Sequence, residues 1–385
     1  MDRGWMFENL QKSPAHCWTV DEFRVFNQLT DNDQEEGCQL NTDLLEDGWT
    51  LVLGKRQKAP IWPGPTFAHG DSSLPDEKGS KREAQSISVK PISSYNWHVT
   101  SWQPTIVVPG APKFFHQWPG GQLLQTNQEM IVDEDTFRFP QAPLDPVLAS
   151  VLTTEPKFDL APIDMICDVS SIKRLARFLF QAFDDLPGCH NRRGPLSEFR
   201  MDLELAGKVV LMIRRENSHV TVWNGYGAAY TKACTIESGD PLLHGPYKRI
   251  SQVQLGGLHL LVRHKVLAGM YPEKLCEKKD RSVPKCGRVG RLQVVAHSAL
   301  GAHTQHYTMV ELGSLYVERQ MSPDKWIDMM ITGCDKFYLG QHNNGWFHSP
   351  RLIDCSQVRH MCGIKNSQAV FCALESLLCQ VRMYL

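Results

Sequence analysis

The sequence lacks the features of a membrane or secreted protein. No apolar run in the chain of 385 residues approaches the roughly 18–20 residues of a membrane span. The densest apolar run extends only from Val209 to Ile213. The first residues, Met1 to Trp5, have polar and charged side chains where a signal peptide needs an apolar stretch. We therefore expect an intracellular protein, in the nucleus or the cytoplasm, with no membrane partner.

The chain also has no excess of one charge. Lys and Arg number 41, Asp and Glu number 42, and the net charge is -1. A chain so balanced has no global positive field to hold a nucleic-acid backbone, so any such contact needs a local patch. The one sizeable basic stretch covers residues 274–291. A solvated surface loop and a patch that binds RNA or protein both fit it. Within it, Lys279 and Arg288 are candidate substrate-binding residues, together with Arg200 elsewhere.

Several motifs of known chemistry are missing. Phosphate-cradling G-x-x-x-x-G-K-[ST] and G-x-G-x-x-G loops do not occur, and neither does a G-x-S-x-G elbow. The pair Asp184-Asp185 lacks the third aspartate and the partner cluster of a prenyl-diphosphate-synthase-type magnesium site. The 12 cysteines form no C-x-x-C pair. Cys355, His360 and Cys362 lie close in sequence, but structural zinc sites use tighter, paired spacings.

Composition divides the chain into three segments. Residues 1–57 form an acidic N-terminal region, in which Asp and Glu outnumber Lys and Arg. Residues 58–91 are rich in Pro, Gly, Ser and charge, which predicts a flexible linker, with a long ordered loop as the alternative. From residue 92 onward strand and helix patterns become dense, so residues 92–385 are expected to form one main domain.

Periodicity within this domain predicts the α/β (α+β) class, a mixed sheet flanked by helices. Apolar residues at helical spacing predict amphipathic helices over residues 170–183 and 369–385. The stretch PTIVVPGAP at 104–112 predicts a short buried strand closed by a Pro-Gly turn. The other strand-like runs, of which the first three should form a meander, are 198–205, 208–214, 219–223, 258–268, 292–296 and 308–312.

Carboxylates on the predicted strands make a metal-dependent hydrolase one possibility. Glu311 lies in the run 308–312. Asp202 and Glu204 alternate with Arg200, and residues two apart on a strand share a face. Carboxylates from neighbouring strands can hold Mg²⁺ or Mn²⁺ for phosphoryl chemistry. Carboxylates that simply face solvent explain the same pattern.

The order and spacing of several longer stretches are informative. Together they resemble the DXO-type decapping exoribonuclease family, in particular its fungal branch, over residues 92–385. The matching stretches are SYNW at 94–97, PTIVVPGAP at 104–112, FPQAPLDP at 139–146, FDLAPIDMICD at 158–168, EFRMDLELAGKVVLMIRRE at 198–216, GYGAAYTKACT at 225–235, YKRISQVQLGGLHLLVRHKVLA at 247–268, MVEL at 309–312 and YLGQHNNGWF at 338–347.

This resemblance implies a fold like that of the PD-(D/E)XK nucleases, in one main domain. It implies chemistry at RNA 5′ ends, namely removal of incomplete or NAD caps or release of pyrophosphate, with Mg²⁺ or Mn²⁺ as cofactor. RNA 5′ ends are then the expected partner. In some members of the family a 5′–3′ exoribonuclease is a protein partner.

Position by position, the family's site is degenerate in this chain. Glu311 alone keeps the family's chemistry. Thr231 stands where the family has a glutamate, and Lys265 and Leu267 replace a Glu-x-Asp pair. Gly313 replaces a lysine. The resemblance therefore implies a nuclease-like site with one of its main functional groups left.

Such a site is poor in ligands for a divalent cation. An ion of this kind needs several anionic oxygens to offset its lost hydration. Two unit charges about 4 Å apart interact by roughly 4 kcal/mol at an effective dielectric constant near 20, so the Lys265 ammonium would repel the ion. We expect Lys265 to occupy the metal position and to pair with Glu311. The alternative is that Lys265 points into solvent and that its match to the family's site is shifted by one residue.

Three functions follow from these observations. The first, which we favour, is a pseudoenzyme that binds RNA or a protein partner and needs no cofactor. The second is an active, metal-dependent RNA 5′-end hydrolase that uses Glu311 with Asp202 and Glu204 as relocated ligands for Mg²⁺ or Mn²⁺. The third is an interaction module in which residues 1–91 recruit a partner.

Overall fold

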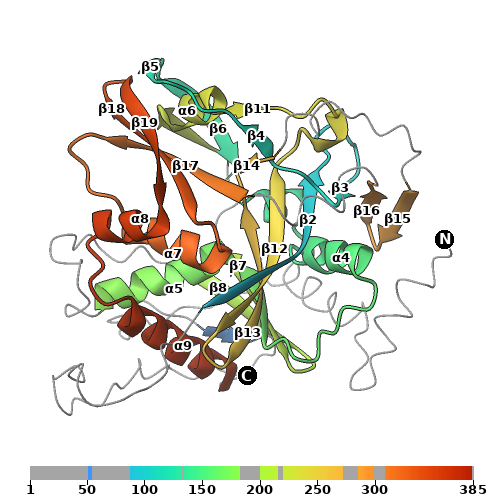
Figure 1. The fold of residues 1–385 in the computed structure, drawn as a ribbon. Helices are drawn as coiled ribbons and strands as arrows, with labels where there is room; N and C mark the ends of the chain where they lie inside the picture. The colour runs from blue at the N-terminus through green and yellow to red at the C-terminus, as the bar shows by residue number, and fades with distance from the viewer. Residues whose placement is uncertain are drawn as a thin grey trace, which may run out of the picture.

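The computed structural model describes residues 51–53, 87–131, 133–182, 200–215, 220–271, 285–297 and 308–383. Strands within these ranges form a ten-stranded sheet, a seven-stranded sheet and a two-stranded sheet. Figure 1 shows β17 to β19 of the seven-stranded sheet at the upper left, and β2, β12 and β13 of the ten-stranded sheet below and to the right of them. No helix in these ranges is long and apolar enough to span a membrane.

The ten-stranded sheet is mixed. β7 runs parallel to both of its neighbours, β9 and β13, whereas β12 pairs antiparallel with β13 and β2. In spatial order its strands are β1 (Leu51–Leu53), β8 (Arg200–Ala206), β9 (Val209–Arg215), β7 (Met165–Asp168), β13 (Leu258–Lys265), β12 (Tyr247–Leu255), β2 (Ser88–Trp97), β3 (Thr105–Val108), β16 (Leu292–Ala296) and β15 (Lys285–Val289).

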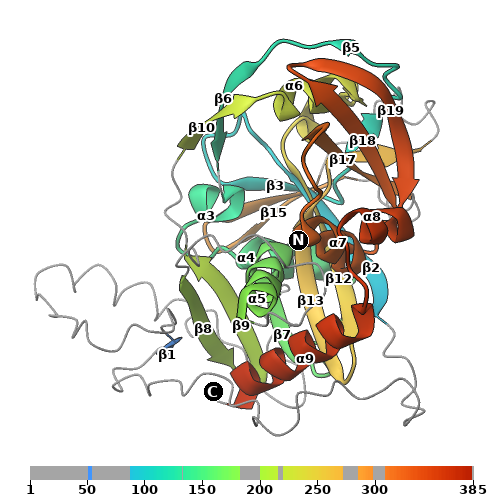
Figure 2. The same cartoon turned by 90° about the vertical axis from the view of Figure 1, so that its left-hand side faces the viewer.

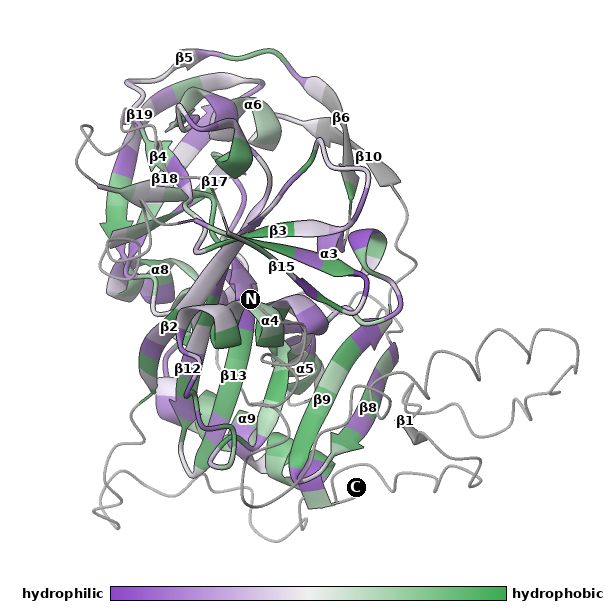
Figure 3. Cartoon of the chain, turned by 90° about the vertical axis from the view of Figure 1, so that its right-hand side faces the viewer, coloured by the Kyte–Doolittle hydropathy of each residue, from purple (hydrophilic) through white to green (hydrophobic). Residues whose placement is uncertain are grey.

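Helices cover both faces of this sheet, and strand alternation divides its apolar side chains between them. On β7, Met165 and Cys167 join a core with α5 (Val169–Ala182) and α9 (Ser367–Met383), whereas Ile166 joins the core with α4 (Asp145–Thr154). Figure 2 shows α5 and α9 across the sheet. Figure 3 shows α4 from the other side, against strands β9 and β13 that are coloured as strongly hydrophobic.

The seven-stranded sheet carries the other helices. Helices α6 (Gly227–Ala233), α7 (Pro323–Thr332) and α8 (Cys355–Met361) pack around it, and buried aromatic rings fill its inner face. In spatial order its strands are β11 (Thr235–Ile236), β4 (Lys113–Phe115), β14 (Ala268–Met270), β17 (Thr308–Tyr316), β18 (Lys336–Asn343), β19 (Trp346–Asp354) and β5 (Gly121–Gln122).

The remaining described elements are short. The pair β6 (Thr126–Ile131) and β10 (Val220–Gly225) forms the two-stranded sheet. Helix α3 (Glu134–Arg138) follows β6, and the 3₁₀ turn η2 comprises Pro241–Leu243. The carboxylate of Asp133 accepts a hydrogen bond from the Thr136 amide and so caps the start of α3.

The expected fold class is confirmed, as are several of its elements. The helix expected over 170–183 is α5, that over 369–385 is α9, and the strand in 104–112 is the fully buried β3. The expected meander is wrong in its third strand. β8 and β9 do form a hairpin, but β10 pairs with β6 in the separate two-stranded sheet.

Two expected boundaries also change. The run 258–268 is two strands, because the chain leaves the ten-stranded sheet after Lys265 and enters the seven-stranded sheet as β14 at Ala268. β2 begins at Ser88, so the end of the expected linker 58–91 belongs to the main sheet. The rest of that linker, and residues 1–50, lie outside the described residues.

Candidate functional site

Glu311 lies on β17 and is held by a lysine from a helix. The ammonium of Lys325, in the first turn of α7, lies 2.7 Å from Oε1 of Glu311. Their side chains are 29% and 16% exposed, respectively. Burial disfavours the ammonium, but the carboxylates of Glu311 and Asp328 outweigh it and raise the pKa of Lys325. Lys325 therefore stays charged and neutralises Glu311.

A phenyl ring fills the position next to this ion pair. Phe337 on β18 is the parallel-strand neighbour of Glu311, and the Lys325 ammonium lies 5.6 Å from the centre of its ring. A Cβ atom on Gly313 would lie 2.5 Å from Cζ of Phe337, which is closer than real contacts allow. A lysine at 313 therefore has no room. We call Glu311, Gly313, Lys325 and Phe337 the Glu311 cluster.

The remaining positions of the expected site bring no carboxylate. Thr231 lies on α6, and its hydroxyl donates a hydrogen bond to the Gly227 carbonyl oxygen of its own helix. Leu267, between β13 and β14, packs against the aromatic core of the seven-stranded sheet. Both side chains make the contacts expected of structural residues.

Lys265 ends β13 and does not pair with Glu311. Its expected ion pair is wrong, because the partner of Glu311 is Lys325. Lys265 is exposed to solvent, yet the surrounding protein desolvates its ammonium and lowers its pKa, and the Lys248 ammonium acts in the same direction. The carboxylates of Glu134 and Glu311 oppose this shift. The expected alternative, in which Lys265 reaches solvent, describes the structure better.

A buried charge network lies beneath Lys265. The guanidinium of Arg263 is fully buried and binds both carboxylate oxygens of Asp168, at 2.6 and 2.8 Å. It also lies 3.4 Å from the buried Asp135, which accepts hydrogen bonds from Tyr95 and Trp97. Burial opposes the charge of Asp135, but Arg263 and Lys248 outweigh it and lower its pKa. These groups satisfy one another and fix α3 on the sheet.

The relocated metal site built from Glu311, Asp202 and Glu204 is not formed. Asp202 and Glu204 lie on β8 in the ten-stranded sheet, whereas Glu311 lies on β17 in the seven-stranded sheet (Figures 1 and 2). Asp202 is buried and accepts from Arg200 at 2.8 Å, as their shared face predicts. Burial, with the nearby carboxylate of Asp145, raises the pKa of Glu204 to about 7.

The residues present do not fit a divalent cation. Over the described ranges, no group of three or more His, Cys, Asp or Glu side chains is placed to hold a metal ion. Glu311 already accepts from an ammonium. A divalent cation needs several free oxygen ligands. No step of a reaction is therefore assigned to a metal here.

The expected substrate-binding residues do not converge. Arg200 pairs with Asp202 on β8. Arg288 lies on β15, at the other end of the same sheet, and donates to the Gln103 side chain at 2.8 Å. Lys279 lies outside the described residues. Arg200 and Arg288 therefore cannot contact one small ligand together.

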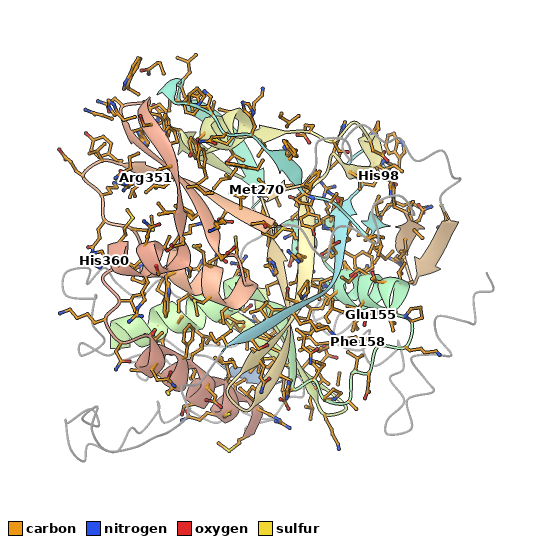
Figure 4. All side chains as sticks on the ribbon, in the orientation of Figure 1. His98, Glu155, Phe158, Met270, Arg351 and His360 are labelled. Carbon is orange, nitrogen blue, oxygen red and sulfur yellow. The ribbon has the colours of Figure 1, made fainter. Side chains whose placement is uncertain are left out.

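Sequence reasoning missed Lys325. Its local signal was the start of an amphipathic helix, Ser322 followed by Pro323 at the first helical position. That pattern places α7 but does not say that its lysine reaches β17. Figure 4 labels Met270, at the end of β14 near the centre of the molecule, and β14 pairs with β17 beside Glu311. This pairing sets Glu311 close to Lys265, which ends the preceding strand β13.

Comparison with known proteins places the chain in a family. A family model described as "Domain of unknown function (DUF8563)" matches residues 80–350. No curated protein matches the sequence.

Several solved structures from fungi are similar to the chain. They include S. pombe Rai1 in complex with 3′-FADP, at 12% sequence identity and a TM-score of 0.48, covering 78% of this chain and 87% of that chain. K. lactis Dxo1 in complex with manganese is 10% identical with a TM-score of 0.46, covering 77% and 81%. Candida albicans Rai1 in complex with pU5-Mn²⁺ is 9% identical with a TM-score of 0.42, covering 78% and 85%. The resemblance noted in the sequence is confirmed as a similarity.

Proposed function

The chain belongs to the family described as a domain of unknown function (DUF8563), and we propose that it binds the 5′ end of RNA without hydrolysing it. In this proposal the nuclease-like fold is retained and the metal-dependent chemistry is lost. The observation that carries the proposal is the ion pair between Glu311 and Lys325, 2.7 Å long.

This ion pair supports the loss of hydrolysis for an electrostatic reason. The one acidic side chain left at the expected site already has a cation beside it, so a metal ion would have to displace Lys325. That displacement would leave a partly buried ammonium next to a doubly charged ion, which is strongly unfavourable. Gly313 supplies no side chain to polarise a phosphate, and Phe337 occupies the space where one would lie.

RNA as the ligand is supported by the sequence. The stretches shared with the decapping family run through most of residues 92–385, and RNA 5′ ends are the substrate that this resemblance implies. A site with exposed lysine and no metal is suited to binding a polyanion and releasing it unchanged. The proposal places the protein in the nucleus or the cytoplasm, where RNA 5′ ends are found.

A turnover assay tests the proposal directly. The purified full chain is incubated with Mn²⁺ or Mg²⁺ and with RNAs that carry a 5′ triphosphate, a methylated or unmethylated cap, or an NAD cap. We expect every RNA to remain intact, as it does with the matched variant Glu311→Ala. Release of any 5′ group by the wild type above the level of Glu311→Ala would refute the proposal.

A binding assay completes the test. Fluorescence anisotropy with labelled single-stranded RNA in EDTA should show binding by the wild type. Absence of any RNA binding at moderate salt would contradict the RNA half of the proposal, whatever the turnover assay gives.

A further inference from the structure

Lys265 stands out as an ammonium without a carboxylate partner. It lies directly opposite Lys248 in the antiparallel pair of β13 and β12. Opposed residues in such a pair have Cβ atoms about 4.5–5.5 Å apart, and like charges there destabilise the sheet. Lys113, on the strand that pairs with β14, adds a further positive charge that acts on Lys265.

The carboxylates around Lys265 are already neutralised by other cations. Glu311 binds Lys325 at 2.7 Å, and Glu134 binds Arg138 at 2.5 Å. The two neighbouring lysines also form ion pairs, Lys248 with Asp135 at 2.7 Å and Lys113 with Glu237 at 2.5 Å. Within the described part of the chain, Lys265 makes no ion pair of its own.

This arrangement leaves one uncompensated positive charge at the corner between the two larger sheets. Solvent reaches Lys265, while the protein around its side chain desolvates the ammonium and lowers its pKa. A lysine so placed gains from any anion that replaces its lost hydration. The ammonium groups of Lys248 and Lys113 lie near Lys265 as well, each paired with its own carboxylate.

We propose that Lys265, backed by Lys248 and Lys113, binds a terminal phosphate group directly, with no metal ion between them. The inference rests on the proposed function and adds the chemical group that this site selects, the 5′ phosphate of RNA. A lysine ammonium binds phosphate as a compact point charge with three N–H donors. The same chemistry would accept free inorganic phosphate.

Anisotropy in EDTA tests this inference with two RNAs of one sequence, one with a 5′ phosphate and one with a 5′ hydroxyl. We expect the wild type to bind the phosphorylated RNA about tenfold more tightly. Lys265→Ala should bring this ratio close to one, and Lys265→Arg should keep most of it. The control Lys208→Ala removes an exposed lysine from the turn between β8 and β9 and should leave the ratio unchanged.

Because Lys265 is exposed, its substitutions should leave the fold intact. Thermal unfolding of each variant checks this, with a midpoint close to that of the wild type as the expected result. Competition by inorganic phosphate separates the two sources of the ligand. A phosphate site is supported if millimolar phosphate weakens binding of the RNA with a 5′ phosphate but not that of the RNA with a 5′ hydroxyl. Competition that reduces binding of both RNAs equally would overturn it, because phosphate would then act only by screening.

Failure of the phosphate site and failure of the proposed function give different experimental results. Equal binding of the two RNAs by the wild type, or a preserved ratio in Lys265→Ala, would overturn the phosphate site and leave RNA binding in place. Release of 5′ groups with Mn²⁺ would overturn the proposed function, while the ratio measured in EDTA would still report on Lys265.

Discussion

The ring of Phe337 occupies the space that a side chain on Gly313 would need. A Cβ atom there would lie 2.5 Å from Cζ of this ring, on the neighbouring strand. We expect Gly313→Lys to lower the free energy of unfolding by about 1–3 kcal/mol, because an overpacked interior forces neighbours to move. In a double-mutant cycle measured by denaturant unfolding, Gly313→Lys should cost less in a Phe337→Ala background than in the wild type. A Gly313→Lys variant as stable as the wild type would contradict the packing described here.

Restoring the family's site residues should not restore metal binding. The variant with Thr231→Glu, Lys265→Glu, Leu267→Asp and Gly313→Lys keeps Lys325 bound to Glu311. The ammonium competes with any metal for that carboxylate, so calorimetric titration with MnCl₂ should show no specific binding. Adding Lys325→Met and Phe337→Ala removes both obstacles and provides the matched comparison. Tight Mn²⁺ binding by the first variant would show that neither side chain blocks the site.

The pair of Glu311 and Lys325 should be strongly coupled. Lys325→Met leaves a partly buried carboxylate without its cation, and we expect a loss of about 1–3 kcal/mol in unfolding free energy, less than for a fully buried pair because both side chains touch solvent. The double variant Glu311→Gln/Lys325→Met should recover most of it. The coupling energy is read from the complete double-mutant cycle. Additive effects of the single variants would mean that the ion pair contributes nothing.

Among the charged residues in the described ranges, Arg263 should be one of the most sensitive to substitution. Its guanidinium is fully buried and binds Asp168 through two nitrogens. We expect Arg263→Met to cost about 3–5 kcal/mol, because it leaves Asp135 and Asp168 without their shared cation. Arg263→Lys should also destabilise, since an ammonium cannot reproduce the two-pronged contact. Arg291→Lys, at an exposed site, is the control, and urea unfolding that ranks these variants otherwise would contradict the network.

Glu204 should make stability fall as pH rises. Burial and Asp145 raise the pKa of its carboxyl to about 7. Between the ordinary value near 4.3 and about 7, the folded state holds a proton that the unfolded chain has lost, so the stability contributed by this group is present at low pH and lost as pH rises. After allowance for partial exposure, Glu204→Gln should gain about 1–2 kcal/mol at pH 8 and nothing at pH 4.

The control for this pH dependence is Glu318→Gln, an exposed glutamate after β17. It should change stability little at either pH. A Glu204→Gln effect that is equal at pH 4 and pH 8 would mean that this carboxyl titrates normally.

Local patterns predicted the parts of the fold that local physics determines. The helical spacing of apolar residues found α5 and α9, and the β-branched run before Pro109 found β3. The passage of the chain between sheets after Lys265 could not be found in this way. The run from Leu258 to Ala268 reads as one continuous strand, and it is interrupted because β14 pairs with β17 and β4 in the other sheet.

At the candidate site too, some features follow from the local sequence and others depend on how distant strands and helices pack. The roles that the resemblance gives to Glu311, as a retained acid, and to Gly313, as a departure from the family, stay predictions. The cation expected beside Glu311 was wrong. Lys265 was chosen because it stands at a metal position of the family's pattern, whereas Lys325 reaches Glu311 through the packing of α7. The closeness of Asp202 and Glu204 along β8 was correct, but their distance from Glu311 depends on which sheet each strand joins.

The passage of the chain from one sheet to the other after Lys265 has a consequence for folding. Lys265 ends a strand of one sheet. Glu311 lies on β17, which pairs with β14, the strand with which the chain enters the other sheet. Neither half of the molecule can present both residues by itself. Ligand binding at this corner would therefore report that both sheets have folded. A fragment that ends on either side of the corner would lack the complete site.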